Sequence, residues 1–401
     1  MEEIRFIHCA DLHLDSPFKG LRQLPVEIFD RIQNSTFKAF ETLINESISR
    51  EVDFIIISGD LFDEEDRSIR AQARLQRQLK KLAKHAIPVY IIHGNHDHLG
   101  GHRIGLDFPE NVHIFGPDVE TKIFQTASGT EVHLTGFSYR SRHITERVVS
   151  EYRKASVDQN YYIGLLHGSE GGVKSLHDTY APFSVPELLE KNYHYWALGH
   201  IHEKKILYKD PYIVYPGNIQ GRHRKESGEK GCYEVILDGN QTSLKWIETQ
   251  DLIWEKINVS MKHIHRFGEV FQKLQSVLEE FREYNGALVE IEMKDVEHLS
   301  PETLRRIDNG ELLEALQVYE ESENFVWVHK LTYQHLQQET QTTEGFLTDL
   351  TSSLSKQSEE DWEEALMELY EHPQAFRYLD VLTSEEKDRI KQEVFQLLVR
   401  E

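Results

Sequence analysis

Five short segments hold the residues of this sequence that could carry out chemistry, and each is rich in Asp, Asn or His. They read "CADLHLD" at 9–15, "ISGDLFD" at 57–63, "HGNHD" at 93–97, "LLHGSEGG" at 165–172 and "LGHIHEK" at 198–204. Carboxylate and amide oxygens are hard ligands and imidazole suits manganese, iron or zinc, so these residue types favour divalent metal ions. No cysteine is among the candidate ligands, which disfavours a structural zinc site. The candidates are Asp11, His13, Asp60, Asn95, His167, His200 and His202.

A pair of metal ions suits these residues better than a single ion. The two histidines of "HIH" point to opposite sides of an extended chain, so a loop that curls between two metals about 3.5–4 Å apart would use both. A carboxylate shared by the two metals offsets their mutual repulsion. Such a pair lowers the pKa of a bound water, supplies hydroxide and neutralises charge on a phosphate in transfer. The chemistry we expect is therefore hydrolysis of a phosphate ester.

The elements that must position these residues are β-strands, because every segment follows a short apolar run. In open α/β sheets, ligands bind at the carboxyl ends of the strands. Gly59, Gly94, Gly168 and Gly199 lie beside the candidate ligands, where the absence of a side chain permits a sharp turn or a close approach. Strands alternating with helices predict an α/β domain. We expect strands at Ile4–Cys9, Asp53–Ser58, Val89–Ile92, Val132–Phe137, Tyr161–Leu166, Tyr195–Leu198, Val214–Tyr215, Cys232–Leu237 and Leu244–Ile247, and helices at about 25–50, 67–85 and 185–192.

The sequence pattern changes near residue 253. A β-α-β-α-β alternation follows, then a polar stretch rich in Thr, Ser and Gln that is typical of a linker, then an acidic helical tail. We therefore predict domains at 1–252 and 253–335, a linker at 336–357 and C-terminal helices at 358–401. In the second domain we expect strands Trp254–Val259, Ala287–Glu292 and Phe325–Thr332, with helices Arg266–Tyr284 and Pro301–Tyr319.

Composition and charge limit the classes of protein that this chain can represent. Its 401 residues are 39% hydrophobic and 28% charged, which predicts a globular protein of two or three domains. We find no run long and apolar enough for a membrane helix and no signal-peptide pattern at the N-terminus; with only two cysteines, the expected location is the cytoplasm. The formal charge of −23 argues against wholesale coating of nucleic acid, but 17 of the 23 excess negative charges lie in the last 147 residues. Local basic surfaces can therefore dominate the field of the N-terminal part.

One such basic surface is predicted at "RSIRAQARLQRQLKKLAK", residues 67–84, which contains seven basic residues and no acidic one. On a helix the basic residues gather on one face, opposite Leu75, Leu79 and Leu82. This face begins just after the Asp60 segment and is placed to hold phosphates by charge. The alternative is a solvated helix face that serves solubility. The candidate DNA contacts are Arg67, Arg70, Arg74, Arg77, Lys81 and Lys84, with Arg222 and its basic neighbours as weaker candidates.

The series Asp-x-His, Gly-Asp-x-x-Asp, Gly-Asn-His-Asp, His-Gly and Gly-His-x-His resembles the calcineurin-like metallophosphoesterases. Within that group the chain is most similar to the SbcD-type DNA repair exonucleases, in particular their YhaO-like branch. The likeness extends over nearly the whole chain and includes "YPGNIQGRH" at 215–223. It implies a four-layer αββα metallophosphoesterase domain, a small α+β capping domain that guides DNA, and a C-terminal helical tail.

The resemblance also implies roles for individual residues. One metal would take Asp11, His13, Asp60 and His202, and the other would take Asp60, Asn95, His167 and His200, so that Asp60 bridges them. His96 would lie beside the phosphate and stabilise the transition state or protonate the leaving 3′ oxygen. For Asp97 two roles stay open, namely orienting His96 or forming a structural turn. We expect manganese, with iron, zinc or magnesium as alternatives.

Two positions depart from the pattern of the relatives. Asp63 occupies the place where eukaryotic members carry a second active-site histidine, which affects proton handling rather than metal binding. Asp15 replaces a frequent glycine, with a consequence that the sequence does not reveal.

The partners implied by the resemblance are duplex DNA and an SMC-like ATPase with a long coiled coil. The acidic tail, which contains Trp362, Leu366, Tyr370, Phe376 and Leu379, could dock such an ATPase; alternatively its apolar residues pack on the chain's own body. A homodimer through the 25–50 region is expected by analogy only.

Three functions are compatible with the sequence. The first is a metal-dependent DNA exonuclease. The second keeps the metal centre but acts on nucleotides, cyclic nucleotides or phosphoproteins. The third is a DNA-binding adaptor with little activity of its own, and the complete set of candidate ligands weighs against it.

Overall fold

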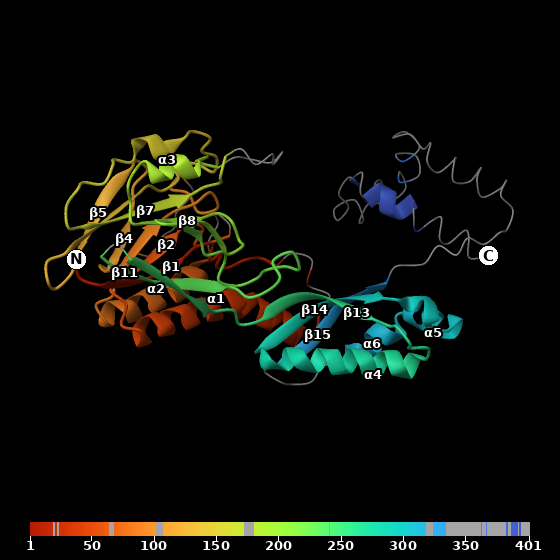
Figure 1. Cartoon of the computed structure of the whole chain (residues 1–401). Helices are drawn as coiled ribbons and strands as arrows, with labels where there is room; N and C mark the ends of the chain where they lie inside the picture. The colour runs from red at the N-terminus through yellow and green to blue at the C-terminus, as the bar shows by residue number, and fades with distance from the viewer. Residues whose placement is uncertain are drawn as a thin grey trace. The chain divides into compact units, whose positions relative to one another are not determined.

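The structure is a computed structural model of the whole chain (Figure 1). It describes residues 1–18, 21, 24–63, 68–100, 107–171, 180–239, 241–317 and 324–333, together with 362, 366, 382–383, 386–391 and 393. The chain divides into two compact units, Met1–Gln334 and His335–Glu401. The predicted linker at 336–357 lies outside the described residues, as do Arg67, Tyr370, Phe376 and Leu379.

The first six-stranded sheet carries three of the five predicted chemical segments. Strands β1 to β4 run parallel to one another, and β11 and β12 extend the sheet in the antiparallel sense beyond β1. Its strand order is β12 (Gln241–Glu248), β11 (Gly231–Asp238), β1 (Ile4–Cys9), β2 (Phe54–Ser58), β3 (Val89–Ile92) and β4 (Val112–Ile114).

The second six-stranded sheet carries the other two segments, at the ends of β7 and β8. Strands β6, β7, β8 and β10 are parallel, whereas the edge strands β5 and β9 pair in the antiparallel sense. The strand order is β5 (Glu120–Gln125), β6 (Glu131–Gly136), β7 (Tyr161–His167), β8 (Tyr195–Gly199), β10 (Tyr212–Tyr215) and β9 (Lys205–Lys209).

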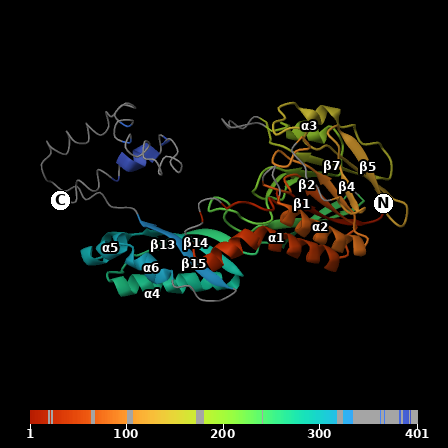
Figure 2. The same ribbon diagram turned by 180° about the vertical axis from the view of Figure 1, so that it is seen from behind.

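The two sheets pack face to face, and helices cover the outer side of each. Helices α1 (Val26–Ser49) and α2 (Ile69–Lys84) lie on the first sheet, and α3 (Val185–Leu189) with the short helix η1 (Val148–Glu151) lies on the second (Figures 1 and 2). This is the four-layer αββα arrangement that the resemblance implied, so the expected fold class is confirmed. No helix in the described part of the chain combines the length and apolar character needed to cross a bilayer.

The alternation of side chains along each strand explains why these strands are apolar throughout. In β2, Phe54 and Ile56 belong to the core between the sheets, whereas Ile55 and Ile57 belong to the core beneath α1 and α2. Successive side chains point to opposite faces, and both faces of the strand are covered. Strand β2 is therefore buried on both sides, and its apolar run gives way to polar residues where the strand ends.

A third sheet of three parallel strands follows, with its own core against α4 to α6. The predicted helix Pro301–Tyr319 is wrong in one respect, because the chain forms two helices that are separated at Gly310, whose φ is +84°. That left-handed conformation ends a helix and is readily adopted by glycine. The elements are β13 (Ile253–Ser260), α4 (Phe267–Leu278), η2 (Glu279–Glu283), β14 (Gly286–Lys294), η3 (Val296–His298), α5 (Pro301–Asp308), α6 (Glu311–Leu316) and β15 (Phe325–Tyr333).

Three strands were not anticipated, namely β4, β5 and β9. All lie at sheet edges, and their side chains are half-buried or exposed. A strand with one solvent-exposed face and one unpaired edge requires few apolar residues, so the hydrophobic pattern that would predict it is weak. The expected strands, by contrast, agree with the observed ones to within a few residues at each end.

We predict that Ile56→Ala lowers the free energy of unfolding by about 2–5 kcal/mol, because it removes a buried side chain between the two sheets and leaves a cavity. Ile123→Ala is the matched control, since Ile123 is 53% exposed on β5, and its effect should stay within about 0.5 kcal/mol. Urea unfolding followed by circular dichroism measures both. Equal losses would contradict a core between the sheets.

Candidate metal centre

The five segments meet because the ends of both sheets meet. Two backbone bonds join the loop after β1 to the loop after β2, from Asp11 N to the Gly59 carbonyl (3.1 Å) and from His13 N to the Asp60 carbonyl (3.0 Å). The second sheet is joined to the first where His200 N donates to both carboxylate oxygens of Asp11, at 3.1 and 3.0 Å. The carboxyl ends of β1, β2, β7 and β8 therefore form one polar cluster.

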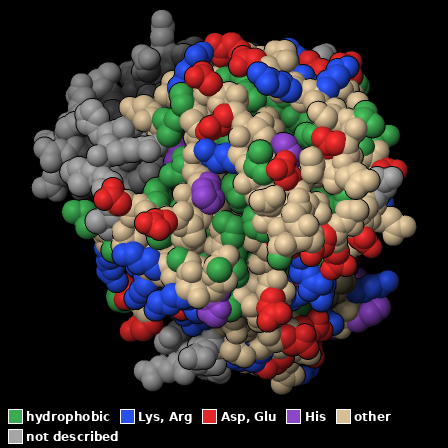
Figure 3. All heavy atoms as spheres, turned by 90° about the vertical axis from the view of Figure 1, so that its left-hand side faces the viewer, with side chains coloured by type: hydrophobic (Ala, Val, Ile, Leu, Met, Phe, Trp, Pro, Cys, Tyr) green, Lys and Arg blue, Asp and Glu red, His purple; other side chains and the backbone are tan. Residues whose placement is uncertain are grey.

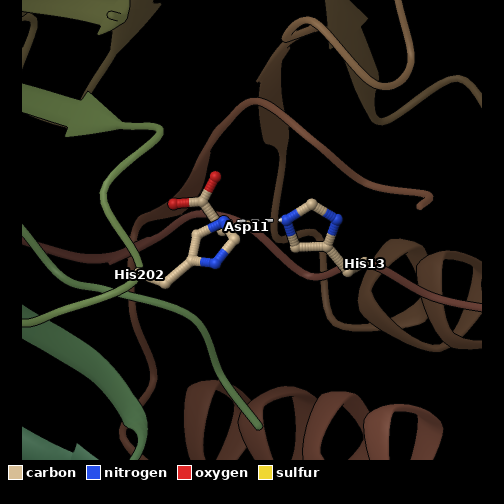
Figure 4. A group of neighbouring side chains, drawn as sticks. All are labelled: Asp11, His13 and His202. Carbon is tan, nitrogen blue, oxygen red and sulfur yellow. Dashed lines mark hydrogen bonds between the residues drawn. The ribbon is translucent and has the colours of Figure 1, made fainter. Parts of the chain in front are cut away.

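One part of the cluster is formed by Asp11, His13 and His202, whose candidate donor atoms all lie within 4.8 Å of one another (Figure 4). The Nε2 atoms of His13 and His202 face each other at 3.1 Å. Two imidazole lone pairs at this distance repel unless a cation, either a proton or a metal ion, lies between them. The arrangement suits a metal ion bound by two imidazoles and a carboxylate.

A second part is formed by Asp11, Asp60 and His167. Nε2 of His167 lies 3.0 Å from Oδ1 of Asn95 and 3.4 Å from Oδ2 of Asp60. The ring of His200 contacts that of His167, with 5.3 Å between their centres. These residues therefore offer oxygen and nitrogen donors around the His167 ring.

Asp60 lies between the two parts. Its Oδ2 atom is 3.4 Å from Nε2 of His167 and 3.9 Å from Nε2 of His13. A carboxylate in this position can contribute an oxygen to each of two cations. The structure thus brings all seven predicted ligand residues together and places Asp60 where a bridging group is expected. The assignment of particular residues to particular metals stays a prediction.

Glycines allow this close approach of the strand ends. A Cβ atom on Gly94 would lie 2.3 Å from Oδ1 of Asp60, and one on Gly199 would lie 1.8 Å from the Ser58 carbonyl oxygen. One on Gly59 would lie 2.2 Å from Nδ1 of His167. The glycines beside the motifs therefore serve the packing of the two sheet ends against each other.

The backbone at the centre is strained. Four of the predicted ligand residues have positive φ values, with Asp11 at 51°, His13 at 42°, Asp60 at 51° and His200 at 104°. Residues with a side chain avoid this region, and each such conformation costs about 1–3 kcal/mol. Strain of this kind persists where the surrounding structure determines the conformation, and it is common at functional sites.

Two of the imidazoles are oriented by an acceptor at Nδ1, and a third has a carboxylate oxygen close to that atom. An acceptor at this position favours the tautomer that carries its proton there, so that the Nε2 lone pair points into the cluster. Metal-binding histidines in proteins are held in the same way. This is the observation on which the fit to divalent metal ions rests. The acceptors are Glu226 for His202 (2.7 Å) and the Ser58 carbonyl for His167 (2.9 Å), and a carboxylate oxygen of Asp63 lies 2.9 Å from Nδ1 of His13 as an ion-pair contact.

The electrostatics of the cluster favour a cation at its centre. Burial alone would raise the pKa of Asp60, but the neighbouring His167 and His13 outweigh it and hold that pKa well below its ordinary value. Burial would lower the pKa of His167, yet Asp60 and Asp11 raise it to about 9. Burial lowers the pKa of His13 and His200 to about 3 and raises that of Asp11 to about 6. The acidic groups therefore hold positive charge near His167, where a metal would replace the proton.

His96 lies at the edge of the cluster. Its backbone N–H donates to Oδ1 of Asp60 (3.0 Å), and its Nδ1 lies 2.7 Å from the carbonyl oxygen of Asp63. That carbonyl, and not Asp97, orients the His96 ring. The carboxylate of Asp97 instead contacts Nδ1 of His93 and accepts bonds from the backbone of Gly94 and Leu61. Of the two roles left open for Asp97, these contacts correspond to the structural turn.

Sequence reasoning missed one residue of the site, Glu226, and did not anticipate the ion pairs of another, Arg222. Arg222 was expected at a DNA-binding surface, but its side chain is 12% exposed and forms ion pairs with Asp63 and Glu226. These contacts place it within the site, and contact with DNA stays a prediction. The only signal in the sequence was "GRHRKE" at 221–226, which places an acidic residue beside the basic ones.

The basic helix forms as expected, as α2, with a serine cap at Ser68 whose side chain accepts a bond from Ala71 N (3.1 Å). Its basic residues divide into two groups. Arg74 bonds to Asn34 and stacks over Phe37 on α1, and Lys81 bonds to Asn45 on the same helix. Exposed positions are held by Arg70, Arg77, Lys80 and Lys84.

Comparison with known proteins agrees with the geometry. The sequence pattern of the calcineurin-like phosphoesterase family matches residues 4–204. The metallophosphoesterase YhaO of Bacillus subtilis is 38% identical, over 100% of this chain and 98% of its own. The DNA double-strand break repair protein Mre11 of Methanocaldococcus jannaschii is 27% identical, over 67% of this chain and 73% of its own, and that of Sulfolobus acidocaldarius is 23% identical, over 88% and 90%.

We predict that manganese raises the melting temperature of the protein and that Asp60→Asn abolishes the increase. A metal that binds only the folded state at 100 times its Kd stabilises that state by about 2.7 kcal/mol, and the Asp60 carboxylate lies between the two parts of the cluster. Differential scanning fluorimetry with and without manganese measures the shift. Asp238→Asn, at an exposed carboxylate at the end of β11, should keep it. A normal shift in Asp60→Asn would contradict the shared role.

Proposed function

The chain belongs to the calcineurin-like phosphoesterase family, and we propose that it is a metal-dependent exonuclease that acts on DNA ends during repair. The observation that carries this proposal is the cluster of seven donor residues in which Asp60 lies between two groups of imidazoles. The similarity to proteins named for double-strand break repair supports DNA as the substrate.

The donor set supports a reaction at phosphorus. Bound at these residues, a pair of divalent metals, which we propose to be manganese, would lower the pKa of a water and neutralise charge on the phosphate. Asp11 and Asp60 are 1% exposed and His13 is fully buried, so their charges and lone pairs act in a medium of low dielectric constant. They bind cations there with little competition from water.

His96 is the group that we propose to contact the scissile phosphate. Because Nδ1 is held by the Asp63 carbonyl, Nε2 is the atom that can face a substrate. When protonated, it can donate to a phosphate oxygen or give its proton to the leaving 3′ oxygen. Loss of such a group typically costs 10²- to 10⁴-fold in rate.

Basic side chains beyond the centre favour a polymeric substrate. Burial lowers the pKa of Arg74, and the positive charges of the nearby Arg70 and Arg77 lower it further. Like charges therefore lie close together on α2. Anionic phosphates relieve this repulsion. Figure 3 shows acidic and basic side chains mixed over the face that it draws.

The small sheet domain offers a second basic group. Arg224, Lys256 and Lys330 are each between 42% and 54% exposed and surround Glu290 at 3.3–3.7 Å. Arg224 is two residues from Arg222, which belongs to the metal centre. These cations extend from the centre onto β13–β15, the domain that we propose guides duplex DNA.

The remaining partners and the location are also proposals. The C-terminal segment is our candidate for docking an SMC-like ATPase, and of its five candidate docking residues the structure describes Trp362 and Leu366. A homodimer through the 25–50 region is proposed by analogy. Cys9 and Cys232 are buried thiols, which suits a reducing cytoplasm.

The experiment that tests the proposal uses duplex DNA labelled separately at each end. We predict shortening that requires manganese, stops on chelation, is absent in Asp60→Ala and falls by about 10²- to 10⁴-fold in His96→Ala. Electrophoresis of timed samples measures the rate, and His85→Ala, at an exposed histidine after α2, is the matched control.

Two outcomes would overturn the exonuclease assignment. Hydrolysis of small phosphodiesters but not of DNA would indicate a phosphoesterase of nucleotides or phosphoproteins. Folded protein that binds DNA but cleaves nothing would indicate an adaptor.

We predict that the double variant Arg70→Glu and Arg77→Glu weakens duplex binding and flattens its salt dependence, because each lost phosphate contact reduces the slope by about one unit. Fluorescence anisotropy at several salt concentrations measures both quantities. The matched control is Lys205→Glu with Lys209→Glu, which reverses two exposed charges on the edge strand β9. If both double variants behave alike, α2 is not a DNA-binding surface.

A further inference from the structure

Glu226 has no assigned role, although it is the most heavily bonded carboxylate near the centre. Its side chain is 6% exposed. Oε1 accepts from His202 Nδ1 (2.7 Å) and Arg222 Nη2 (3.0 Å). Oε2 accepts from Arg222 N (2.8 Å) and Asn218 Nδ2 (2.9 Å). A buried carboxylate that receives this many donors is fixed in place.

Arg222 joins Glu226 to a second carboxylate, that of Asp63. One end of its guanidinium bonds to Asp63 and the other to Glu226. Asp63 in turn lies 2.9 Å from Nδ1 of His13. The planar fork of arginine therefore fixes the distance between two carboxylates, each of which holds one imidazole of the pair His13 and His202.

The clamp formed by Asp63, Arg222 and Glu226 acts on only one part of the centre. The imidazole of the other part, His167, is held at Nδ1 by the backbone carbonyl of Ser58, which no side-chain substitution removes. The two parts therefore differ in what orients them, since one depends on the side chains of Asp63 and the 218–226 loop and the other on the strand end itself.

We propose that Glu226 and Asp63 are positioning residues that hold His202 and His13 with Nε2 directed at one metal ion, and that this clamp sets the affinity of that ion alone. The inference rests on the proposed metal centre and adds that its two positions can be separated by substitution. Changes to groups that orient metal-binding histidines typically cost 10- to 100-fold in metal affinity.

The test is titration calorimetry of manganese into the metal-free, full-length protein. The parent should bind two ions. Glu226→Gln keeps the size of the side chain but brings an NH2 donor among groups that are themselves donors, so one of the two ions should bind about 10- to 100-fold more weakly while the other is unchanged. Asn95→Ala should instead weaken the ion that Glu226→Gln leaves intact.

Controls separate positioning from folding. Glu229→Gln changes an exposed carboxylate on the same loop, paired with Lys204, and should bind both ions as the parent does. If Glu226→Gln does not fold, Asp63→Asn tests the same position through His13. Normal binding of both ions, or equal weakening of both, would overturn the clamp. A parent that binds no metal would instead overturn the proposed centre itself.

Discussion

The arrangement of the centre depends on the repulsion between groups that the fold forces together without water. Asp11 and Asp60 are buried beside each other, and His13 and His202 direct ring nitrogens at each other over 3.1 Å. Unit charges about 4 Å apart interact by about 4 kcal/mol at an effective dielectric constant of 20. Such a cluster is stable only with positive charge inside it, and protons at pH 7 or metal ions can provide that charge. Affinity for divalent cations is thus a direct consequence of burial.

The rest of the fold keeps this cluster from relaxing. The core between the sheets, with Phe6 stacked on Phe54 at 4.9 Å, fixes the positions of the strand ends. The backbone is strained at Asp60 and His200. A Cβ atom on the neighbouring glycines would collide with atoms of the adjoining strand ends. The strand ends therefore lie closer together than residues with side chains would permit. Closely packed interiors deform little, so the groups cannot move apart to reduce their repulsion.

The groups that surround the centre are not equivalent. On one side, the carboxylates of Asp63 and Glu226, which Arg222 links, contact the imidazoles directly, and on the other a backbone carbonyl does so. The side chain of Asp63 contacts His13, while its carbonyl contacts His96. One residue therefore connects the proposed metal position with the group proposed to contact the phosphate.

The sequence alone determined the strands and the polar residues at their ends, because apolar runs buried on both faces and side chains confined to the ends leave a strong local pattern. The four-layer fold followed from the resemblance of its motifs to a known family. It did not reveal the edge strands β4, β5 and β9, since their half-exposed faces carry little hydrophobic signal, nor the break at Gly310. The meeting of the two sheets, the place of Asp60 between the imidazoles and the pairing of Arg222 with Asp63 and Glu226 were decided by tertiary structure. Those contacts join residues up to 189 positions apart, and only the packing of one sheet on the other sets their distances.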